Sequence, residues 1–283
     1  MTVREVLNEG SGRLSEAAID TARLDSSLIL CHCLNITREK LFASLPDDVP
    51  DEALKMFGKL IEMRLDHHPV AYLTGTKEFF GLPFHVEEGV LCPRPDTELL
   101  VETVLSLTEK DKALKDVLDM CTGTGCIAVS LKNSDSSLNV SASDISPVAE
   151  KVFSINNCTL ADGSINFTKS SLFEKIEGTF DIIVTNPPYL TTGETEERME
   201  EGWKEPALAL DGGNDGLDLI RIIIGEAPDY LNEGGYLLIE AHPAQMESMK
   251  VCMESEGFRD IAVLKDLPGL DRVICGRKGP VNV

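Results

Sequence analysis

Residues 116–126 have the sequence DVLDMCTGTGC, which indicates the fold of the segment around them. Its first five residues are typical of a short buried strand, CTGTG is a glycine-rich loop, and residues 127–131 (IAVSL) begin a helix. This order lets backbone N–H groups approach a ligand closely. Nineteen residues after Gly125, Asp144 closes a second strand-like run, where an acid is placed to bind ribose hydroxyls. The segment therefore predicts a cofactor site formed by Cys121, Thr122, Gly123, Thr124, Gly125 and Asp144.

The loop alone leaves the identity of that cofactor open. The dinucleotide fingerprint Gly-x-Gly-x-x-Gly lacks its third glycine, since Ala128 stands there, but the fingerprint tolerates alanine at that place. NAD and other adenosine-bearing cofactors both fit this segment. The next motif favours a cofactor other than NAD, because hydride transfer has no evident use for it.

That motif is Asn186-Pro187-Pro188-Tyr189, which closes the apolar run FDIIVT at residues 180–185. Two successive prolines end a central strand, and they free the carbonyls of Asn186 and Pro187 from the strand ladder. The Asn186 amide adds an acceptor and two donors, and Tyr189 offers an aromatic face. Such a cluster suits a planar group that bears an NH₂. We predict catalytic roles for Asn186, Pro187 and Tyr189, and substrate binding by all four residues. A plain proline-rich turn is the competing interpretation.

Strand-like and helix-like segments alternate from about residue 96 onward, which predicts a doubly wound, largely parallel α/β sheet. The expected strands are residues 117–121, 139–144, 165–169, 180–186, 234–240, 260–264 and 272–276. A short loop around Pro268-Gly269 separates the last two, so we expect them to be antiparallel. Ligands bind at the carboxyl ends of strands in such sheets. The glycine-rich loop, Asp144 and residues 186–189 all fall at such ends.

The first 73 residues are predicted to be helical. Thr2 and Glu5 form a capping-box pattern before a first helix, a second helix is expected over residues 17–34, and a third runs from an Asp51 cap to His67. The predicted domains are therefore a helical domain at residues 1–73, a connecting β-hairpin at 74–95 and an α/β domain at 96–283.

Two connecting segments carry predictions of their own. Apolar runs on both sides of Glu87-Glu88-Gly89 predict that the hairpin turns there. Pro95 then leads into an expected helix over residues 99–107, and Arg94 is placed to pair with a carboxylate. The polar, acidic stretch 191–203 is predicted to be a mobile loop or lid beside the site.

Composition limits the possible functions. The 283 residues are 42% hydrophobic and 26% charged, with a net charge of −22, which opposes binding to a nucleic-acid backbone. The eight cysteines form no Cys-x-x-Cys pair, so no metal site is predicted. The start is not an apolar export segment, and no run approaches the roughly 18 apolar residues of a membrane helix. We expect a cytoplasmic protein that binds no membrane.

Several motifs together resemble one family, the bacterial peptide chain release factor glutamine N5-methyltransferases (HemK/PrmC type). The resemblance covers nearly the whole chain. Its segments are residues 71–75 (AYLTG) with Glu78-Phe79, 93–98 (PRPDTE), 122–125 (TGTG), 186–189 (NPPY), and Glu205-Pro206 with Ala209-Leu210. The NPPY motif is shared with methyltransferases that act on amino groups of DNA bases, whereas PRPDTE and the helical N-terminal domain are more specific to the glutamine family.

The resemblance implies a class I fold dependent on S-adenosylmethionine (SAM), with a seven-stranded sheet whose last strand pair is reversed. It implies methylation of the glutamine in a Gly-Gly-Gln motif of release factors, with S-adenosyl-L-homocysteine as product. Cys121–Gly125 would form the SAM loop, Asp144 would bind the ribose, Leu172 would lie by the adenine, and Asn186 would touch cofactor and substrate. Asp119 keeps an acidic position before the loop.

Two residues depart from the family pattern. Cys121 replaces the first glycine of the usual loop, where a Cβ restricts φ, and Leu172 stands where some relatives have an aromatic ring.

The N-terminal domain would bind the release factor or close over the site, and a purely structural bundle is the alternative. We expect a monomer. Methylation of a nucleic-acid base, of the adenine N6 type, is the alternative activity.

Overall fold

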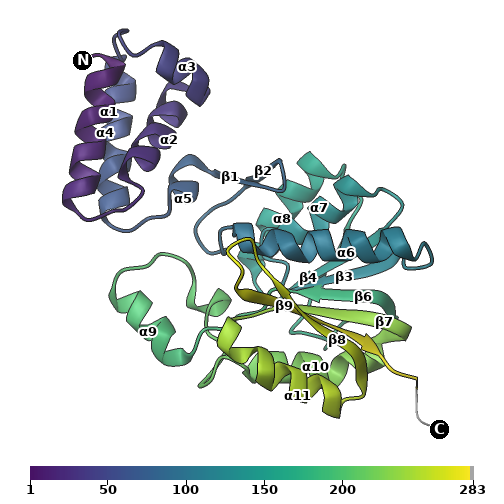
Figure 1. Cartoon of the computed structure of the whole chain (residues 1–283). Helices are drawn as coiled ribbons and strands as arrows, with labels where there is room; N and C mark the ends of the chain where they lie inside the picture. The colour runs from purple at the N-terminus through teal and green to yellow at the C-terminus, as the bar shows by residue number, and fades with distance from the viewer. Residues whose placement is uncertain (281–283) are drawn as a thin grey trace. The chain divides into compact units, whose positions relative to one another are not determined.

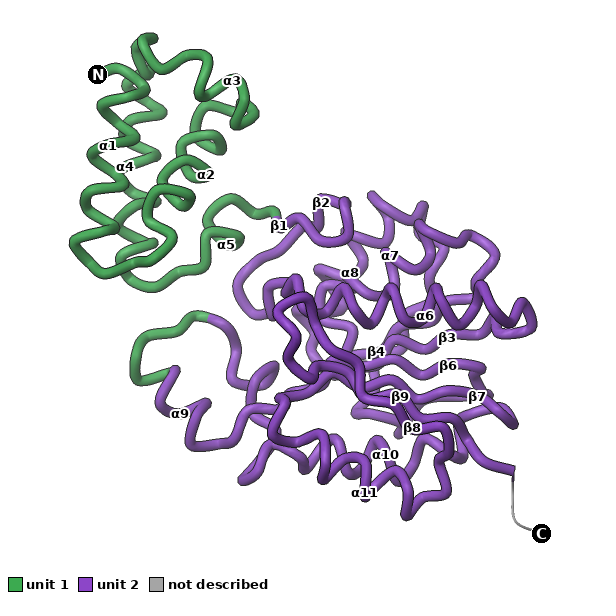
Figure 2. Tube along the Cα trace, in the orientation of Figure 1, with its two compact units in different colours: residues 1–76, 199–204 green, residues 77–198, 205–283 purple. Residues whose placement is uncertain are grey.

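The computed structural model describes residues 1–280, which divide into two compact units (Figure 2). The first unit contains residues 1–76 together with 199–204, and the second contains the other described residues. No helix within the described part of the chain combines the length and apolar character needed to cross a membrane.

The first unit is helical, as predicted. Its helices are α1 (Val3–Glu16), α2 (Ala22–Leu34), α3 (Arg38–Ala43), α4 (Asp51–Leu65) and α5 (Val70–Thr74). The capping box at Thr2 is confirmed, because the Thr2 hydroxyl and the Glu5 carboxylate accept each other's backbone N–H. Arg64 and Asp25 form a largely buried ion pair at 2.7 Å that joins α4 to α2.

Two predicted helix starts in this unit are wrong. The second helix begins at Ala22 rather than residue 17, because the chain leaves α1 through a left-handed residue, Ala18, with φ 57°. Asp51 does not cap α4 but is its first residue, and Pro50 precedes the helix without a side-chain cap. An acidic residue in the first turn still stabilises the helix through its dipole.

A hairpin of β1 (Thr76–Phe79) and β2 (Leu82–His85) follows, and all of it except Thr76 belongs to the second unit. Its turn lies at Phe80-Gly81, not at residues 87–89 as predicted. Both turn residues have positive φ, 51° and 74°, which gives a two-residue turn the twist that joins antiparallel strands. The Glu98 carboxylate accepts the Phe80 N–H at 2.8 Å and so ties the hairpin to the helix that follows.

The remaining elements of the second unit alternate as predicted. They are η1 (Pro95–Thr97), α6 (Glu98–Lys110), β3 (Asp116–Met120), α7 (Cys126–Ser134), β4 (Asn139–Asp144), α8 (Pro147–Leu160), β5 (Asn166–Lys169), β6 (Phe180–Thr185), α9 (Thr192–Glu200), η2 (Ala207–Ala209), α10 (Asp218–Tyr230), β7 (Leu231–Glu240), η3 (Pro243–Gln245), α11 (Met246–Ser255), β8 (Phe258–Lys265) and β9 (Asp271–Lys278).

The strands form one sheet in the order β5-β4-β3-β6-β7-β9-β8. The first five of these are parallel, β9 is antiparallel to β7, and β8 is antiparallel to β9. This confirms the predicted class I methyltransferase fold and the antiparallel pairing of the last two strands, of which β9 alone runs against the parallel strands. Helices α6, α7 and α8 cover one face, and α10 and α11 cover the other (Figure 1).

The central strands are apolar on both faces because both faces are covered. Along β6, Ile182 and Val184 belong to the core under α6–α8, whereas Ile183 belongs to the core under α10 and α11. This alternation follows from the two-residue period of a strand. The buried sheet thus fixes where the loops at its carboxyl edge emerge.

One predicted loop is partly helical. The acidic stretch at residues 191–203 contains α9, which begins with a capping box that sequence inspection overlooked. The Thr191 hydroxyl accepts the Glu194 N–H at 3.1 Å, and the Glu194 carboxylate accepts the Thr191 N–H at 2.9 Å. Such reciprocal bonds satisfy N–H groups that a helix start leaves unpaired.

Candidate active site

The predicted site segments meet at one edge of the sheet. Met120 at the end of β3 pairs in register with Ser143 of β4 on one side and with Thr185 of β6 on the other. The loops that begin at Cys121, Asp144 and Asn186 therefore start side by side. The sequence alone placed them at strand ends, and the parallel register brings them together.

The glycine-rich loop has a glycine-like backbone at its first residue. Cys121, Gly123 and Gly125 have φ values of 58°, 55° and 81°. Buried Asp119 holds the loop from below, since its Oδ2 accepts the Thr122 hydroxyl at 2.5 Å and the Ala128 N–H at 3.0 Å. Burial raises the pKa of Asp119 to about 7. Asp119 thus supports the loop.

Cys121 has a left-handed backbone conformation, so a glycine at this position should give a more stable protein than an alanine. A left-handed conformation costs a residue with a Cβ roughly 1–2 kcal/mol, and glycine loses about 0.5–1 kcal/mol in chain entropy. We expect Cys121→Gly to be more stable than Cys121→Ala, with a melting temperature higher by roughly 2–4 °C for each kcal/mol gained. Thermal denaturation of the two variants, which both lack the thiol, measures this. Equal melting temperatures would show that the loop is unstrained.

Asp144 closes β4 and turns toward the glycine-rich loop. Its Oδ2 accepts the Gly123 N–H at 2.9 Å, and its Oδ1 accepts the Ser146 N–H at 2.8 Å. Burial raises its pKa, and these backbone donors oppose the rise. The carboxylate is thus held in one orientation, and each oxygen keeps a lone pair with which it can accept a ligand hydroxyl.

A cavity of about 180 Å³ lies where these loops meet. Its wall combines the loops after β3, β4 and β6 with residues before η1 and around η2. The lining residues are Gly89, Val90, Leu91, Met120, Cys121, Gly123, Ser143, Asp144, Ile145, Ser146, Ala149, Ser170, Ser171, Leu172, Asn186, Pro188, Pro206, Leu208, Ala209 and Leu219.

The predicted residues divide into two groups at this cavity. Cys121, Gly123, Asp144, Leu172, Asn186 and Pro188 line it. The remaining five, Thr122, Thr124, Gly125, Pro187 and Tyr189, belong to the same two loops but do not line the cavity. Gly125 is the N-cap residue of α7, and a Cβ there would collide with the Phe153 ring. Leu172 has φ 46°, a second strained residue in the wall.

The loop after β6 is held by neighbours on both sides. The Asn186 Nδ2 donates to the Thr97 hydroxyl at 3.1 Å. The Gln245 Nε2 donates to the Tyr189 carbonyl at 2.9 Å. Gly216 lies against the Tyr189 backbone so closely that no Cβ would fit there. Burial, followed by the charge of Glu240, raises the pKa of Tyr189 to about 12, so its phenol stays neutral.

The cavity wall at residues 206–209 is anchored by buried Glu205. Its Oε1 accepts the Cys92 N–H at 3.0 Å, and its Oε2 forms an ion pair with Arg94. Arg94 was predicted to pair with a carboxylate, which is confirmed. Burial, followed by the charge of Glu205, raises the pKa of Cys92 to about 12. Glu205 thus fastens one wall segment to the PRPDTE segment.

Replacing Glu205 should loosen this wall. Removing one partner of a buried pair is destabilising, but Arg94 is 40% exposed, so we expect Glu205→Gln to cost about 1–3 kcal/mol. Its melting temperature should fall by several degrees, and the affinity for the cofactor should fall with it. Thermal denaturation and calorimetry, with exposed Glu254→Gln as the control, measure both. Unchanged values would show that the wall holds without the pair.

Sequence inspection missed several residues of this site. Thr97 was inside the quoted PRPDTE segment but had no role, and Glu240 ends an apolar strand as Asp144 does. An acid that closes a buried strand was the available signal for Glu240. Ile145 and Leu208, which line the cavity, are ordinary loop residues and gave no signal.

Known proteins resemble this chain over its whole length. Family models of the PrmC N-terminal domain and of the methyltransferase small domain match residues 5–75 and 83–204. A "Release factor glutamine methyltransferase" of Geobacter sulfurreducens is 37% identical over 98% of this chain and 97% of its own, and one of Clostridium acetobutylicum is 36% identical over 99% of each.

Among solved structures, a methyltransferase from Pyrococcus furiosus is similar with a TM-score of 0.51 and 17% identity, over 72% of this chain and 92% of its own. At that identity the likeness concerns the fold alone. The sequence relatives carry the assignment, because they match both domains at more than a third of positions. The chain belongs to the family of release factor glutamine methyltransferases.

Proposed function

We propose that this protein transfers a methyl group from SAM to the side-chain amide nitrogen (N5) of the glutamine in the Gly-Gly-Gln motif of peptide chain release factors. The observation that carries the proposal is the Asn186–Tyr189 loop, which borders the same cavity as Asp144 and the glycine-rich loop. The loop that would bind the amide and the carboxylate that would bind the ribose thus border one cavity. The choice of a release factor as the substrate rests on the family to which the chain belongs.

The cavity fits the adenosyl part of SAM. Asp144 offers carboxylate oxygens for the ribose hydroxyls, and Gly123 brings no side chain into the space above it. Ile145 and Leu172 provide apolar surface for the adenine ring. Bound SAM supplies a methyl group on a positively charged sulfur, and S-adenosyl-L-homocysteine is the product.

The residues after β6 would prepare the glutamine amide for attack. An amide nitrogen is a weak nucleophile because its lone pair is delocalised. The Asn186 Oδ1 and the Pro187 carbonyl would accept the two N–H bonds of the substrate amide, and Tyr189 would pack against its plane. The acceptors orient the NH₂ group, and their dipoles favour the positive charge that develops on nitrogen. The methylated nitrogen would then release one of its two protons to solvent, so no residue needs to be assigned as a general base for the transfer itself.

The helical unit would supply recognition of the protein substrate. We propose that residues 1–73 bind the release factor, that residues 74–95 connect this domain to the α/β domain at 96–283, and that the enzyme works as a cytoplasmic monomer. The net charge of −22 supports a protein substrate over a nucleic acid, because phosphate backbones are bound by lysine and arginine.

Transfer of labelled methyl from SAM tests this proposal. The purified enzyme would be incubated with a release factor and, separately, with duplex DNA and with RNA of mixed sequence. We expect label in the release factor alone. Label in nucleic acid alone would overturn the proposal in favour of a base methyltransferase.

A further inference from the structure

Glu240 is a buried acid beside the amide-binding loop. It is the last residue of β7 and is 1% exposed. Thr185 and Ile239 are paired in the parallel register of β6 and β7, so the next residues, Asn186 and Glu240, follow side by side. Glu240 is absent from the cavity wall. It therefore lies behind Asn186 and not in contact with the cavity.

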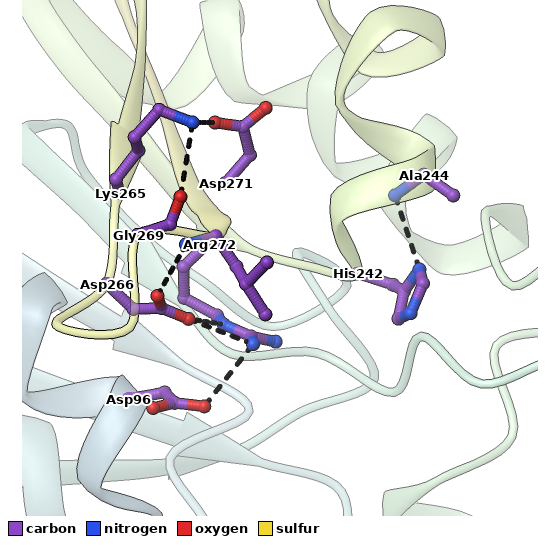
Figure 3. A network of polar contacts seen from close by, with 9 residues as sticks. Asp96, His242, Ala244, Lys265, Asp266, Gly269, Asp271 and Arg272 are labelled. Atoms are coloured by element: carbon purple, nitrogen blue, oxygen red, sulfur yellow. Dashed lines mark hydrogen bonds and ion pairs between the residues drawn. The ribbon is translucent and has the colours of Figure 1, made fainter.

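The surroundings of Glu240 stabilise its ionised form from several elements. The nearby Thr97 hydroxyl and Asn186 amide, together with the positive charge of Arg272, lower the pKa of Glu240 against the effect of burial. Arg272 is fixed by Asp266 at 3.1 Å and Asp96 at 3.3 Å (Figure 3). The Glu240 Oε2 is nonetheless buried without a hydrogen-bond partner among the described residues.

A carboxylate next to an asparagine selects one of two amide orientations. The two ends of the asparagine amide are an acceptor oxygen and a donor NH₂. An ionised Glu240 can only accept hydrogen bonds, so it disfavours an arrangement in which Oδ1 faces it. The observed bond from Nδ2 to Thr97 has the same sense. Glu240 and Thr97 thus both favour the orientation in which the Asn186 NH₂ group faces them. The Oδ1 atom is then the acceptor on the other side of the amide.

We propose that Glu240 is a positioning residue that holds the Asn186 side chain in the orientation whose Oδ1 accepts the substrate amide, an inference that rests on the proposed function. A flipped Asn186 would present a donor to the substrate NH₂, which also donates, and the two would repel. Glu240 therefore acts through Asn186 and Thr97 and does not touch substrate or cofactor.

Protonation of Glu240 should remove its constraint on the orientation of the Asn186 side chain. Burial raises the pKa of Glu240 to about 7, while Thr97, Arg272 and Asn186 oppose the rise and Asp96 adds to it. The other titratable neighbours, Tyr189 and Cys126, have pKa values raised by burial to about 12 and stay neutral. Above pH 7 Glu240 is ionised and accepts; below pH 7 it gains a proton, can donate to Oδ1, and releases the constraint.

Steady-state kinetics of Glu240→Gln test the consequence for catalysis. We expect kcat to fall by at least about tenfold, with SAM affinity within about twofold of the parent, and an inflection of kcat near pH 7 to be lost. Asp181→Asn is the matched control: it changes a carboxylate at the opposite end of the neighbouring strand, where it accepts the Lys115 and Asp116 N–H groups. A normal kcat and pH profile in Glu240→Gln would overturn the inference.

Nuclear magnetic resonance separates this inference from the proposed substrate. The Asn186 side-chain NH₂ signal, assigned by its absence in Asn186→Ala, would be followed from pH 5.5 to 8.5 on ¹⁵N-asparagine-labelled protein without substrate. We expect a shift with a midpoint near 7 in the parent and none in Glu240→Gln. The same titration in both proteins, or none in the parent, would overturn the inference whatever the enzyme methylates.

Discussion

Asn186→Ala should lower kcat by about 10²–10³-fold and leave the Kd for SAM within about threefold of the parent. The Asn186 side chain borders the cavity and offers an amide oxygen, whereas on our proposal Asp144 and the glycine-rich loop would hold the cofactor. Truncation therefore removes an acceptor for the substrate amide and little of the cofactor site. Labelled-methyl turnover and calorimetry measure the two quantities.

The control for this variant is Asn232→Ala. Asn232 also donates through its side-chain Nδ2, at 2.8 Å to Asp181, but at the opposite edge of the sheet. It should cost stability and leave kcat of the folded enzyme near the parent value. Equal losses of turnover and SAM affinity in Asn186→Ala would contradict a substrate role and make Asn186 a cofactor ligand.

Asp144→Ala should weaken SAM binding by about 10²-fold or more. Hydrogen bonds to a charged acceptor are each worth about 1.5–3 kcal/mol, and Asp144 would accept two from the ribose. Its loss also frees the Gly123 N–H at the loop it now orients. Calorimetry with SAM gives the Kd.

The control for Asp144 is Asp116→Ala, at the amino end of β3, where the carboxylate accepts the Asn139 amide at 2.9 Å. This variant should bind SAM like the parent. A Kd for Asp144→Ala within about threefold of the parent would show that other residues bind the ribose. The loss of two such hydrogen bonds should raise the Kd far more than threefold.

The parts of the fold that could be predicted from the sequence were those marked by local patterns. Each strand of the sheet was predicted from a short apolar run bounded by turn residues, and the antiparallel pairing of the last two strands was predicted from the brief loop at Pro268-Gly269. The errors have local causes as well. The turn at Phe80-Gly81 requires positive φ at a phenylalanine, which its residue type opposes. The start of α9 was marked by Thr191 and Glu194, a capping pattern outweighed by the polar composition around it.

Residues of the site could be predicted only where a single segment of sequence contains the groups that indicate their role. The glycine-rich loop, Asp144 and Asn186 could be identified because their positions at strand ends, or their glycines, limit the roles that these residues can have. The supporting residues act across long sequence separations: Thr97 meets Asn186 from 89 positions away, and Glu205 meets Arg94 from 111. Such pairings depend on strand order and register, which no local pattern contains.

The most direct test of the account is tandem mass spectrometry of a release factor after reaction with this enzyme and SAM. We predict a gain of one methyl group, located by fragmentation on the side chain of the Gly-Gly-Gln glutamine, and no gain when that glutamine is replaced by alanine. Methyl transfer to the alanine variant, or to any other residue of the parent release factor, would contradict the account.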